Sequence, residues 1–117
     1  MVFSRPLLFV AALFGAAGVA LAALGSHSGE PNIAIAANFL QLHAAALVGL
    51  SFLPGRPMFR TGPWALAAGT LLFAGDLLAR SQLGAALFPM AAPVGGVAMI
   101  LGWLVVAAAV LLMRHDR

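Results

Sequence analysis

Two side chains that could do chemistry, His43 and Asp76, lie inside otherwise apolar stretches of this sequence. His43 lies about ten residues into its stretch, which is about 15 Å along a helix. An imidazole at that depth can relay a proton or bind a metal or cofactor, and it can equally make an interhelical hydrogen bond that stabilises packing. Asp76 precedes Arg80 by four residues, so the two share a helix face. They form either a self-neutralising ion pair near a helix end or a carboxylate site for a cation or proton.

Three further polar residues complete the candidate site: His27, Asn38 and Gln41. His27 follows the first apolar stretch, where it is either a solvated residue, a partner for the helix C terminus or part of a polar cluster with His43 and Asp76. A helical wheel places Asn38 and Gln41 on a different face from His43. Two histidines and one carboxylate could bind a divalent metal, but no spacing here requires it. We therefore predict no metal site.

The sequence contains no constellation typical of an enzyme. It has no cysteine, and we find no nucleophile–base pair, phosphate-binding loop or paired carboxylates. The methionines have no repeated spacing that would indicate copper transport. We therefore expect no enzymatic activity and no cofactor.

Four long apolar stretches must position these side chains. Hydrophobic residues make up 63% of the chain and charged residues 8%, whereas a typical soluble domain is about 25% charged. Each stretch is close to the roughly 20 residues that a helix needs to cross a bilayer. The alternating pattern of a membrane barrel is absent. The sequence predicts an all-α integral membrane protein in one domain, residues 1–117, with four transmembrane helices arranged up-down-up-down. They cover about 6–25, 32–53, 63–80 and 94–113, and residues 83–92 are predicted to form an interfacial or re-entrant segment.

The arginines predict the orientation of this bundle. With four spans, one side of the membrane receives Arg5, Arg56, Arg60, Arg114 and Arg117. The other side receives only Arg80. The positive-inside rule then places both termini in the cytoplasm, in a bacterial cytoplasmic (inner) membrane. The net charge of +3 follows from this topology, and we expect no binding to nucleic acid.

The start of the chain allows two interpretations. Arg5, the apolar run and the small residues Ala20-Leu21-Ala22 together resemble a cleaved signal peptide. The run is longer than a usual signal core, however, and three further spans follow it. We expect it to be retained as the first transmembrane helix.

Small residues recur at helical spacing, and such rows let helices approach closely in lipid. The predicted packing residues are Gly15, Gly18, Gly25, Gly69, Gly95, Gly96, Gly102 and the mid-membrane Trp103. These rows serve either packing within the bundle or homo-oligomerisation through an exposed face. We favour packing within the bundle.

Four short motifs occur in order along the chain and together resemble one known family. They are Gly18-Val19-Ala20-Leu21-Ala22-Ala23-Leu24-Gly25-Ser26-His27, His43-Ala44-Ala45-Ala46-Leu47, Leu72-Phe73-Ala74-Gly75-Asp76-Leu77, and Pro93-Val94-Gly95-Gly96 with Gly102-Trp103. The set is similar to a family of small bacterial membrane proteins catalogued as domain of unknown function 423, to which eukaryotic transmembrane protein 256 is related. The resemblance implies a four-helix inner-membrane protein without an established activity. The chain departs from the family's pattern at Asp76 and Ser26, where relatives carry a small hydroxyl residue and alanine, and the first departure puts in doubt any role that needs a neutral side chain there.

The observations favour a structural or accessory component of a membrane complex. The expected partners are the lipid bilayer and either another membrane protein or further copies of the chain. One alternative is a transporter or channel for protons, cations or a small solute that uses His43 and Asp76. Another is a lipid- or quinone-interacting membrane enzyme with the same two residues as acid and base.

Overall fold

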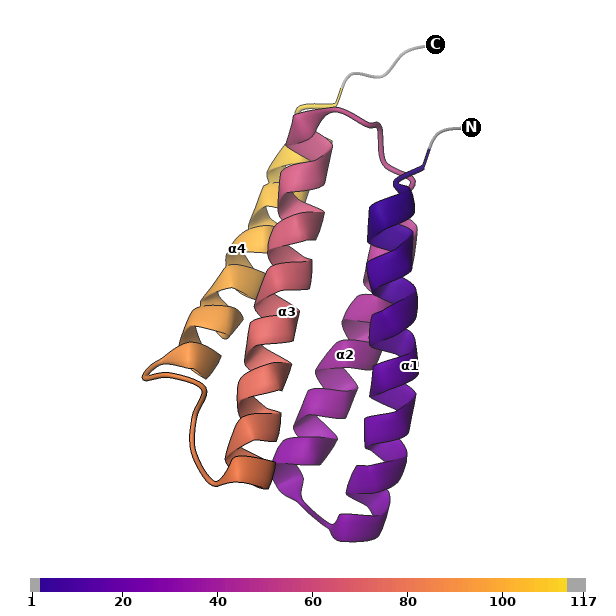
Figure 1. The fold of residues 1–117 in the computed structure, drawn as a ribbon. Helices are drawn as coiled ribbons and strands as arrows, with labels where there is room; N and C mark the ends of the chain where they lie inside the picture. Colours follow the sequence, from indigo (N-terminus) through magenta and orange to yellow (C-terminus); the bar gives the residue numbers. More distant parts are fainter. Residues whose placement is uncertain (1–2, 114–117) are drawn as a thin grey trace.

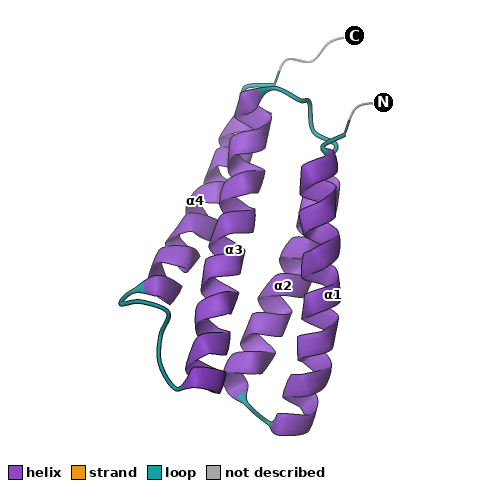
Figure 2. Cartoon of the chain, viewed as in Figure 1, coloured by secondary structure: helices purple, strands orange, loops and turns teal. Residues whose placement is uncertain are grey.

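Each predicted span forms an α-helix in the computed structural model, which describes residues 3–113 (Figure 1 and Figure 2). The helices are α1 (Arg5–Ser28), α2 (Pro31–Leu50), α3 (Pro57–Leu83) and α4 (Ala91–Leu111). All four are long and apolar enough to cross a membrane. Consecutive helices run in opposite directions, so α1 begins and α4 ends at the same end of the bundle (Figure 1). The predicted all-α membrane bundle of four helices is confirmed.

The arginines that predict orientation lie mostly where the sequence placed them. Arg5 starts α1, and Arg56 and Arg60 lie at the start of α3, at the same end of the bundle. Arg80 lies in the last turn of α3, at the opposite end. Arg114 and Arg117 lie outside the described residues. The cytoplasmic location of both termini stays a prediction.

The bounds predicted for the third helix, 63–80, are wrong at both ends. The helix begins at Pro57, because a proline in the first turn needs no backbone donor and starts a helix rather than interrupting it. Pro63 therefore lies inside α3, where it removes one backbone hydrogen bond. At the other end the helix continues to Leu83 and stops at Gly84, which has a φ of 73°.

The other helix ends differ from the prediction by at most three residues. α1 continues to Ser28 instead of 25, and α2 ends at Leu50 instead of 53. α4 begins at Ala91 instead of 94, directly after Met90, whose φ is 70°. The predicted interfacial or re-entrant segment, 83–92, is therefore a shorter loop of residues 84–90. This loop turns back beside α3 before α4 starts (Figure 1).

Ser51 connects three helix ends. Its hydroxyl donates to the Val48 carbonyl oxygen at 2.6 Å, within the end of α2. Its own carbonyl oxygen accepts from the Ser4 backbone N–H at 2.8 Å and from Arg60 Nη1 at 3.1 Å. Ser4 immediately precedes α1, and Arg60 lies in the first turn of α3. The starts of α1 and α3 are thus held against the end of α2.

The bundle consists of two helical hairpins, α1–α2 and α3–α4, which meet mainly through α2 and α3. α1 and α3 scarcely touch. Within the described residues the backbone of α4 packs against α3 alone. The molecule is therefore an open arrangement of two hairpins rather than a closed four-helix bundle in which each helix contacts two neighbours.

Paired glycines bring α3 and α4 into backbone contact at two levels. A Cβ atom at Gly69 would lie 2.8 Å from the Gly95 carbonyl oxygen, and one at Gly95 would lie 2.8 Å from the Gly69 carbonyl oxygen. Seven residues away on each helix, a Cβ at Gly62 would lie 2.9 Å from the Gly102 carbonyl oxygen. Such short contacts leave no room for a methyl group. Gly62 is a packing residue that the sequence analysis missed, because it lies in a segment predicted to be loop.

The α1–α2 hairpin uses glycines from α1 only. A Cβ at Gly18 would lie 2.7 Å from Gln41 Cγ and 3.0 Å from the Gln41 backbone nitrogen, and one at Gly25 would lie 3.3 Å from the Ala34 backbone nitrogen. The remaining two predicted packing glycines are not at close helix contacts. Gly15 would make only an ordinary contact at 3.8 Å, and Gly96 has nothing within 4 Å of the added atom.

Candidate functional site

His43 is buried in the middle of α2 with both ring nitrogens hydrogen-bonded. Its side chain is 2% exposed. Nδ1 lies 2.9 Å from the Phe39 carbonyl oxygen, and Nε2 lies 3.2 Å from Trp103 Nε1. A carbonyl oxygen only accepts and an indole N–H only donates, so these two partners assign the proton to Nδ1 and the lone pair to Nε2. The geometry is that of a neutral imidazole with no nitrogen left for a metal or a solute.

Aromatic rings surround this histidine and connect three helices. The His43 ring lies 5.8 Å from the Trp103 ring of α4 and 6.1 Å from the Phe39 ring one turn earlier on α2. Phe39 in turn contacts Phe73 of α3, with 4.7 Å between ring centroids. Trp103, which we predicted to be a core packing residue, is 40% exposed. Its role here is to donate a hydrogen bond across α3 to α2, rather than to fill a buried core.

Asp76 is buried in α3 and accepts three hydrogen bonds. Oδ1 accepts from the Leu87 backbone N–H at 2.8 Å. Oδ2 accepts from the Ala92 backbone N–H at 3.1 Å and from Arg80 Nε at 3.0 Å. The Asp76 side chain is 0% exposed and that of Arg80 is 44% exposed, so the pair extends from the interior to the surface.

These bonds give Asp76 a clear local effect. Leu87 belongs to the loop 84–90, and Ala92 belongs to the first turn of α4. The carboxylate therefore lies at the N terminus of α4, where helix dipole and backbone donors favour negative charge. It holds both the returning loop and the start of α4 against α3. A neutral amide at Asp76 would weaken this attachment.

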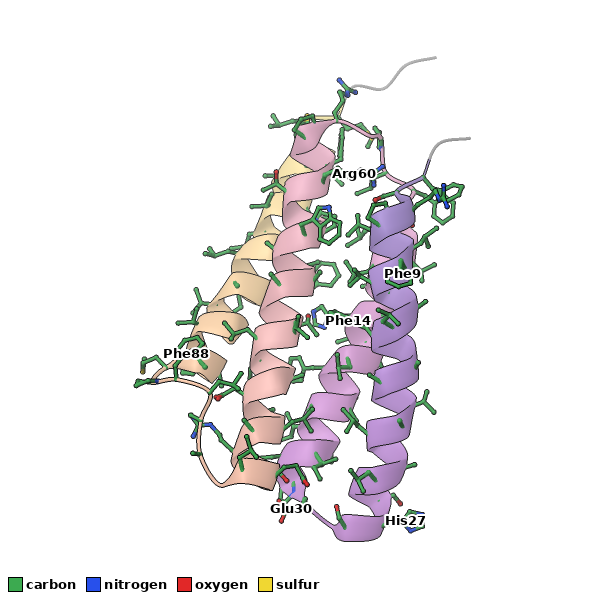
Figure 3. All side chains as sticks on the ribbon, in the orientation of Figure 1. Phe9, Phe14, His27, Glu30, Arg60 and Phe88 are labelled. Atoms are coloured by element: carbon green, nitrogen blue, oxygen red, sulfur yellow. The ribbon has the colours of Figure 1, made fainter. Side chains whose placement is uncertain are left out.

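The remaining polar candidates lie apart from His43 and Asp76. His27 is exposed in the last turn of α1 and lies at the end of the bundle, near Glu30 (Figure 3). Asn38 and Gln41 are exposed on α2 and help to line a shallow groove of about 330 Å³ against α1. No three of the described His, Asp and Glu side chains are grouped as metal ligands. Of the alternatives for His27, the one in which it converges with His43 and Asp76 in a polar cluster is wrong, because His43 and Asp76 have separate partners and His27 is exposed.

An apolar groove between α1 and α3 was not foreseen from the sequence. It has a volume of about 500 Å³. Its walls carry no charged residue and come from three helices: Val10, Leu13, Phe14, Ala17, Leu21, Leu40, Trp64, Ala67, Ala68, Leu71, Ala74, Gly75 and Leu78. The groove exists because α1 and α3 both pack on α2 but scarcely on each other. No local sequence pattern indicates how far apart α1 and α3 lie.

A family model described as "Protein of unknown function (DUF423)" matches residues 14–96. The chain belongs to this family. It is 32% identical over 123 residues to inner membrane protein YgdD of Escherichia coli (strain K12), covering 95% of this chain and 94% of that relative. The protein of the same name from Shigella flexneri matches to the same extent. No solved structure matches the chain.

The DUF423 match includes both principal candidate residues, His43 and Asp76, and the packing glycines of the first hairpin. Gly102 and Trp103 follow the matched range, although the YgdD relatives cover 95% of the chain. Together with four helices able to span a bilayer, these relatives identify a multi-pass protein of the inner membrane.

Proposed function

We propose that this DUF423 protein is a non-catalytic accessory component of a complex in the inner membrane. The proposal rests on one observation. The two intramembrane side chains that could do chemistry, those of His43 and Asp76, are hydrogen-bonded to other groups of the same chain. His43 has one partner for each ring nitrogen, and the Asp76 carboxylate accepts three hydrogen bonds. Side chains that are hydrogen-bonded in this way stabilise the helix bundle and are not free to bind and release protons or ions.

The transport alternative finds less support in the same geometry. A proton relay needs a donor and an acceptor that can pass a proton onwards, whereas His43 faces a carbonyl oxygen and an indole. Neither His43 nor Asp76 lines the apolar groove. Neither residue lines the groove beside Asn38 and Gln41.

Reconstitution and affinity purification test the accessory role against transport. Purified protein in vesicles with an entrapped pH-sensitive dye is expected to give no proton flux above protein-free vesicles. Tagged protein, purified gently from its own membranes, is expected to co-purify with a partner protein at fixed stoichiometry. A tag on that partner should in turn co-purify this chain. A proton flux that disappears in a folded His43→Phe variant would support transport and overturn the proposal.

A second candidate function follows from the apolar groove. We infer that it holds one hydrocarbon chain of a membrane lipid or quinone. Between Trp64 and Leu78 the groove follows α3 for about 21 Å, so its 500 Å³ corresponds to a cross-section of about 24 Å². A single hydrocarbon chain fits this width.

Native mass spectrometry tests this second candidate. Delipidated protein is incubated separately with phosphatidylglycerol and with ubiquinone, and retained molecules are counted. Ala68→Trp, which places a large side chain in the groove, is expected to lower the number of retained lipid or quinone molecules several-fold. Ala16→Trp is the matched control, because Ala16 is exposed on α1 but does not line the groove. Equal retention by both variants would exclude the groove as the binding site.

A further inference from the structure

Arg60 lies at one end of the apolar groove. The groove follows α3 from Trp64 to Leu78, and Arg60 precedes Trp64 by four residues, so it lies on the same helix face one turn beyond the groove. Its Nη1 donates to the Ser51 carbonyl oxygen at 3.1 Å. The same oxygen accepts from the backbone N–H of Ser4, which precedes α1. The Arg60 side chain therefore extends from α3 towards the start of α1, across the end of the groove.

The positive charge of Arg60 has no counter-charge among the described residues. Its side chain is half-buried, and its single hydrogen bond uses one of the several N–H donors of a guanidinium. The described acidic residues are Glu30 and Asp76, and the ion pair in the described part of the chain is Arg80 with Asp76. A cation beside an apolar wall is costly when no anion accompanies it. The remaining donors of Arg60 are thus suited to an anion from outside the chain.

The two ends of the groove differ in charge. Two further arginines, Arg5 and Arg56, lie at the same end of the bundle as Arg60. Figure 3 shows Glu30 at the opposite end, where its carboxylate accepts from Ser81 Oγ at 3.1 Å. An anion is therefore favoured at the Arg60 end and disfavoured at the other. The Arg60 end is also the one that the positive-inside rule predicts to face the cytoplasm, and anionic lipids give that side of a membrane its negative surface potential.

A phospholipid matches both the groove and the arginine. The groove follows α3 for about 21 Å, and one leaflet of the hydrocarbon core is roughly 15 Å thick, so an acyl chain from the leaflet on the Arg60 side fits along it. The phosphate then lies near the first turn of α3, where the planar guanidinium of Arg60 matches phosphate oxygens. The Trp64 ring, 40% exposed, lies between these two levels, as amphipathic rings do at a membrane interface.

Charge distinguishes between the classes of lipid. A quinone has no charge and leaves that of Arg60 without a counter-charge. A zwitterionic phospholipid brings an ammonium group to an end of the bundle that holds Arg5, Arg56 and Arg60 and no described carboxylate. An anionic phospholipid brings a net negative charge without that repulsion. Charge complementarity therefore favours the anionic phospholipid.

We propose that Arg60 binds the phosphate of an anionic phospholipid, one acyl chain of which lies in the apolar groove. The proposal rests on the inferred role of the groove in holding a hydrocarbon chain, and it adds the class of lipid and the end at which the headgroup lies. It involves neither His43 nor Asp76, so it is separate from the accessory role.

Native mass spectrometry tests the choice of lipid. Delipidated protein is incubated with an equimolar mixture of phosphatidylglycerol and phosphatidylethanolamine with the same acyl chains. The wild-type protein is expected to retain several-fold more phosphatidylglycerol. Arg60→Gln should abolish this preference without lowering the number of retained phosphatidylethanolamine molecules, and Arg60→Lys, which keeps the charge, should preserve part of it.

Arg56→Gln is the matched control, because Arg56 is exposed at the same end of the bundle and its guanidinium lies over the Phe59 ring. This variant should keep the preference for phosphatidylglycerol. Equal retention of the two lipids by the wild-type protein would overturn the proposal. The same would follow if Arg56→Gln abolished the preference as completely as Arg60→Gln does.

Trp64 fluorescence provides a second arm in a bilayer. The chain has two tryptophans, so Trp103→Phe leaves Trp64 as the single reporter at the groove. Vesicles contain equal amounts of both lipids, with bromine on the acyl chains of one of them. Brominated phosphatidylglycerol should quench Trp64 more strongly than brominated phosphatidylethanolamine, and Arg60→Gln should remove the difference while circular dichroism shows unchanged helix content. Equal quenching by both lipids without the Arg60 substitution would contradict the proposal.

Ala68→Trp distinguishes failure of the headgroup site from failure of the groove. In mass spectrometry this variant should lower the number of retained molecules of both phospholipids several-fold. Such a fall, in a protein whose wild type shows no preference for phosphatidylglycerol, would leave the groove in place and overturn only the site at Arg60. Unchanged retention of both lipids by Ala68→Trp would overturn the groove and the headgroup site together.

Discussion

The α1–α2 and α3–α4 hairpins share a glycine spacing but pack differently. In α3–α4, glycines face each other from both helices, Gly62 opposite Gly102 and Gly69 opposite Gly95. In α1–α2, the glycines come only from α1 and meet residues of α2 that carry side chains. In the second hairpin an added Cβ would therefore meet backbone atoms as close as 2.7 Å, whereas in the first the closest atom is in the Gln41 side chain and backbone atoms lie at 3.0 Å or more.

Their polar groups differ in the same direction. Asp76 in α3–α4 is buried, and its hydrogen bonds lie within the hairpin. Asn38 and Gln41 in α1–α2 are exposed and line the groove between these two helices. The α3–α4 hairpin thus hydrogen-bonds its buried carboxylate internally, whereas the α1–α2 hairpin leaves two amides exposed.

The largest expected effect distinguishes two adjacent glycines of α4, Gly95 and Gly96. A methyl group in Gly95→Ala would meet the Phe73 backbone nitrogen at 2.7 Å and the Gly69 carbonyl oxygen at 2.8 Å, and neither can move without shifting a helix. We expect a loss of about 3 kcal/mol in the free energy of unfolding, measured by SDS titration in mixed micelles with circular dichroism. Gly96→Ala, with open space around it, should be neutral or stabilising by up to about 1 kcal/mol. Similar losses for both variants would show that backbone contact does not govern this interface.

The next effect concerns the attachment of the loop 84–90. Asp76→Asn presents an N–H₂ group to at least one of the donors from Leu87, Ala92 and Arg80, so hydrogen bonds are lost at the start of α4. We expect the unfolding temperature to fall by several degrees. Arg80→Gln should lower it less, because the Arg80 side chain is 44% exposed. A larger fall for Arg80→Gln would mean that the ion pair, rather than the backbone donors, holds the loop.

A smaller effect is expected in the first hairpin. In Gly18→Ala the closest atom is Gln41 Cγ, at 2.7 Å, and a side chain can turn aside more easily than a backbone can. The Gln41 backbone nitrogen at 3.0 Å still adds some strain. We expect a loss of about 1 kcal/mol in the same SDS titration. A loss as large as that of Gly95→Ala would remove the distinction between the two hairpins.

The smallest effect tests an unpartnered hydroxyl of α3. Thr70 is fully buried, and its Oγ1 is the buried side-chain polar atom without a hydrogen bond in the described part of the chain. Thr70→Val keeps the shape and removes the hydroxyl, so stability should stay the same or rise by up to about 1 kcal/mol. The unfolding midpoint of this variant measures the change. Clear destabilisation would reveal that Thr70 donates a hydrogen bond after all.

The sequence predicts the number and type of the helices well, because the length of an apolar run is a local property. It predicts their ends less well, since Pro57 and Pro63 are compatible with a helix start, a helix interior or a loop. It singles out His43 and Asp76 because polar residues in apolar runs are conspicuous. It does not reveal their partners, since Trp103 lies 60 residues from His43 and the Asp76 bonds depend on a loop that returns beside α3. The apolar groove is harder still to predict, because it reflects how far apart two helices lie.

The bonding of Asp76 also has a consequence for biosynthesis. Asp76 leaves the ribosome before Leu87 and Ala92 do, so α3 on its own has only Arg80 to offset a carboxylate that the folded chain buries. A charged group inside the membrane is costly, and the start of α4 lowers this cost for α3 when the Ala92 backbone N–H donates to Asp76. We therefore expect α3 and α4 to insert into the membrane as a pair. Their insertion is complete when the start of α4 has bound the Asp76 carboxylate.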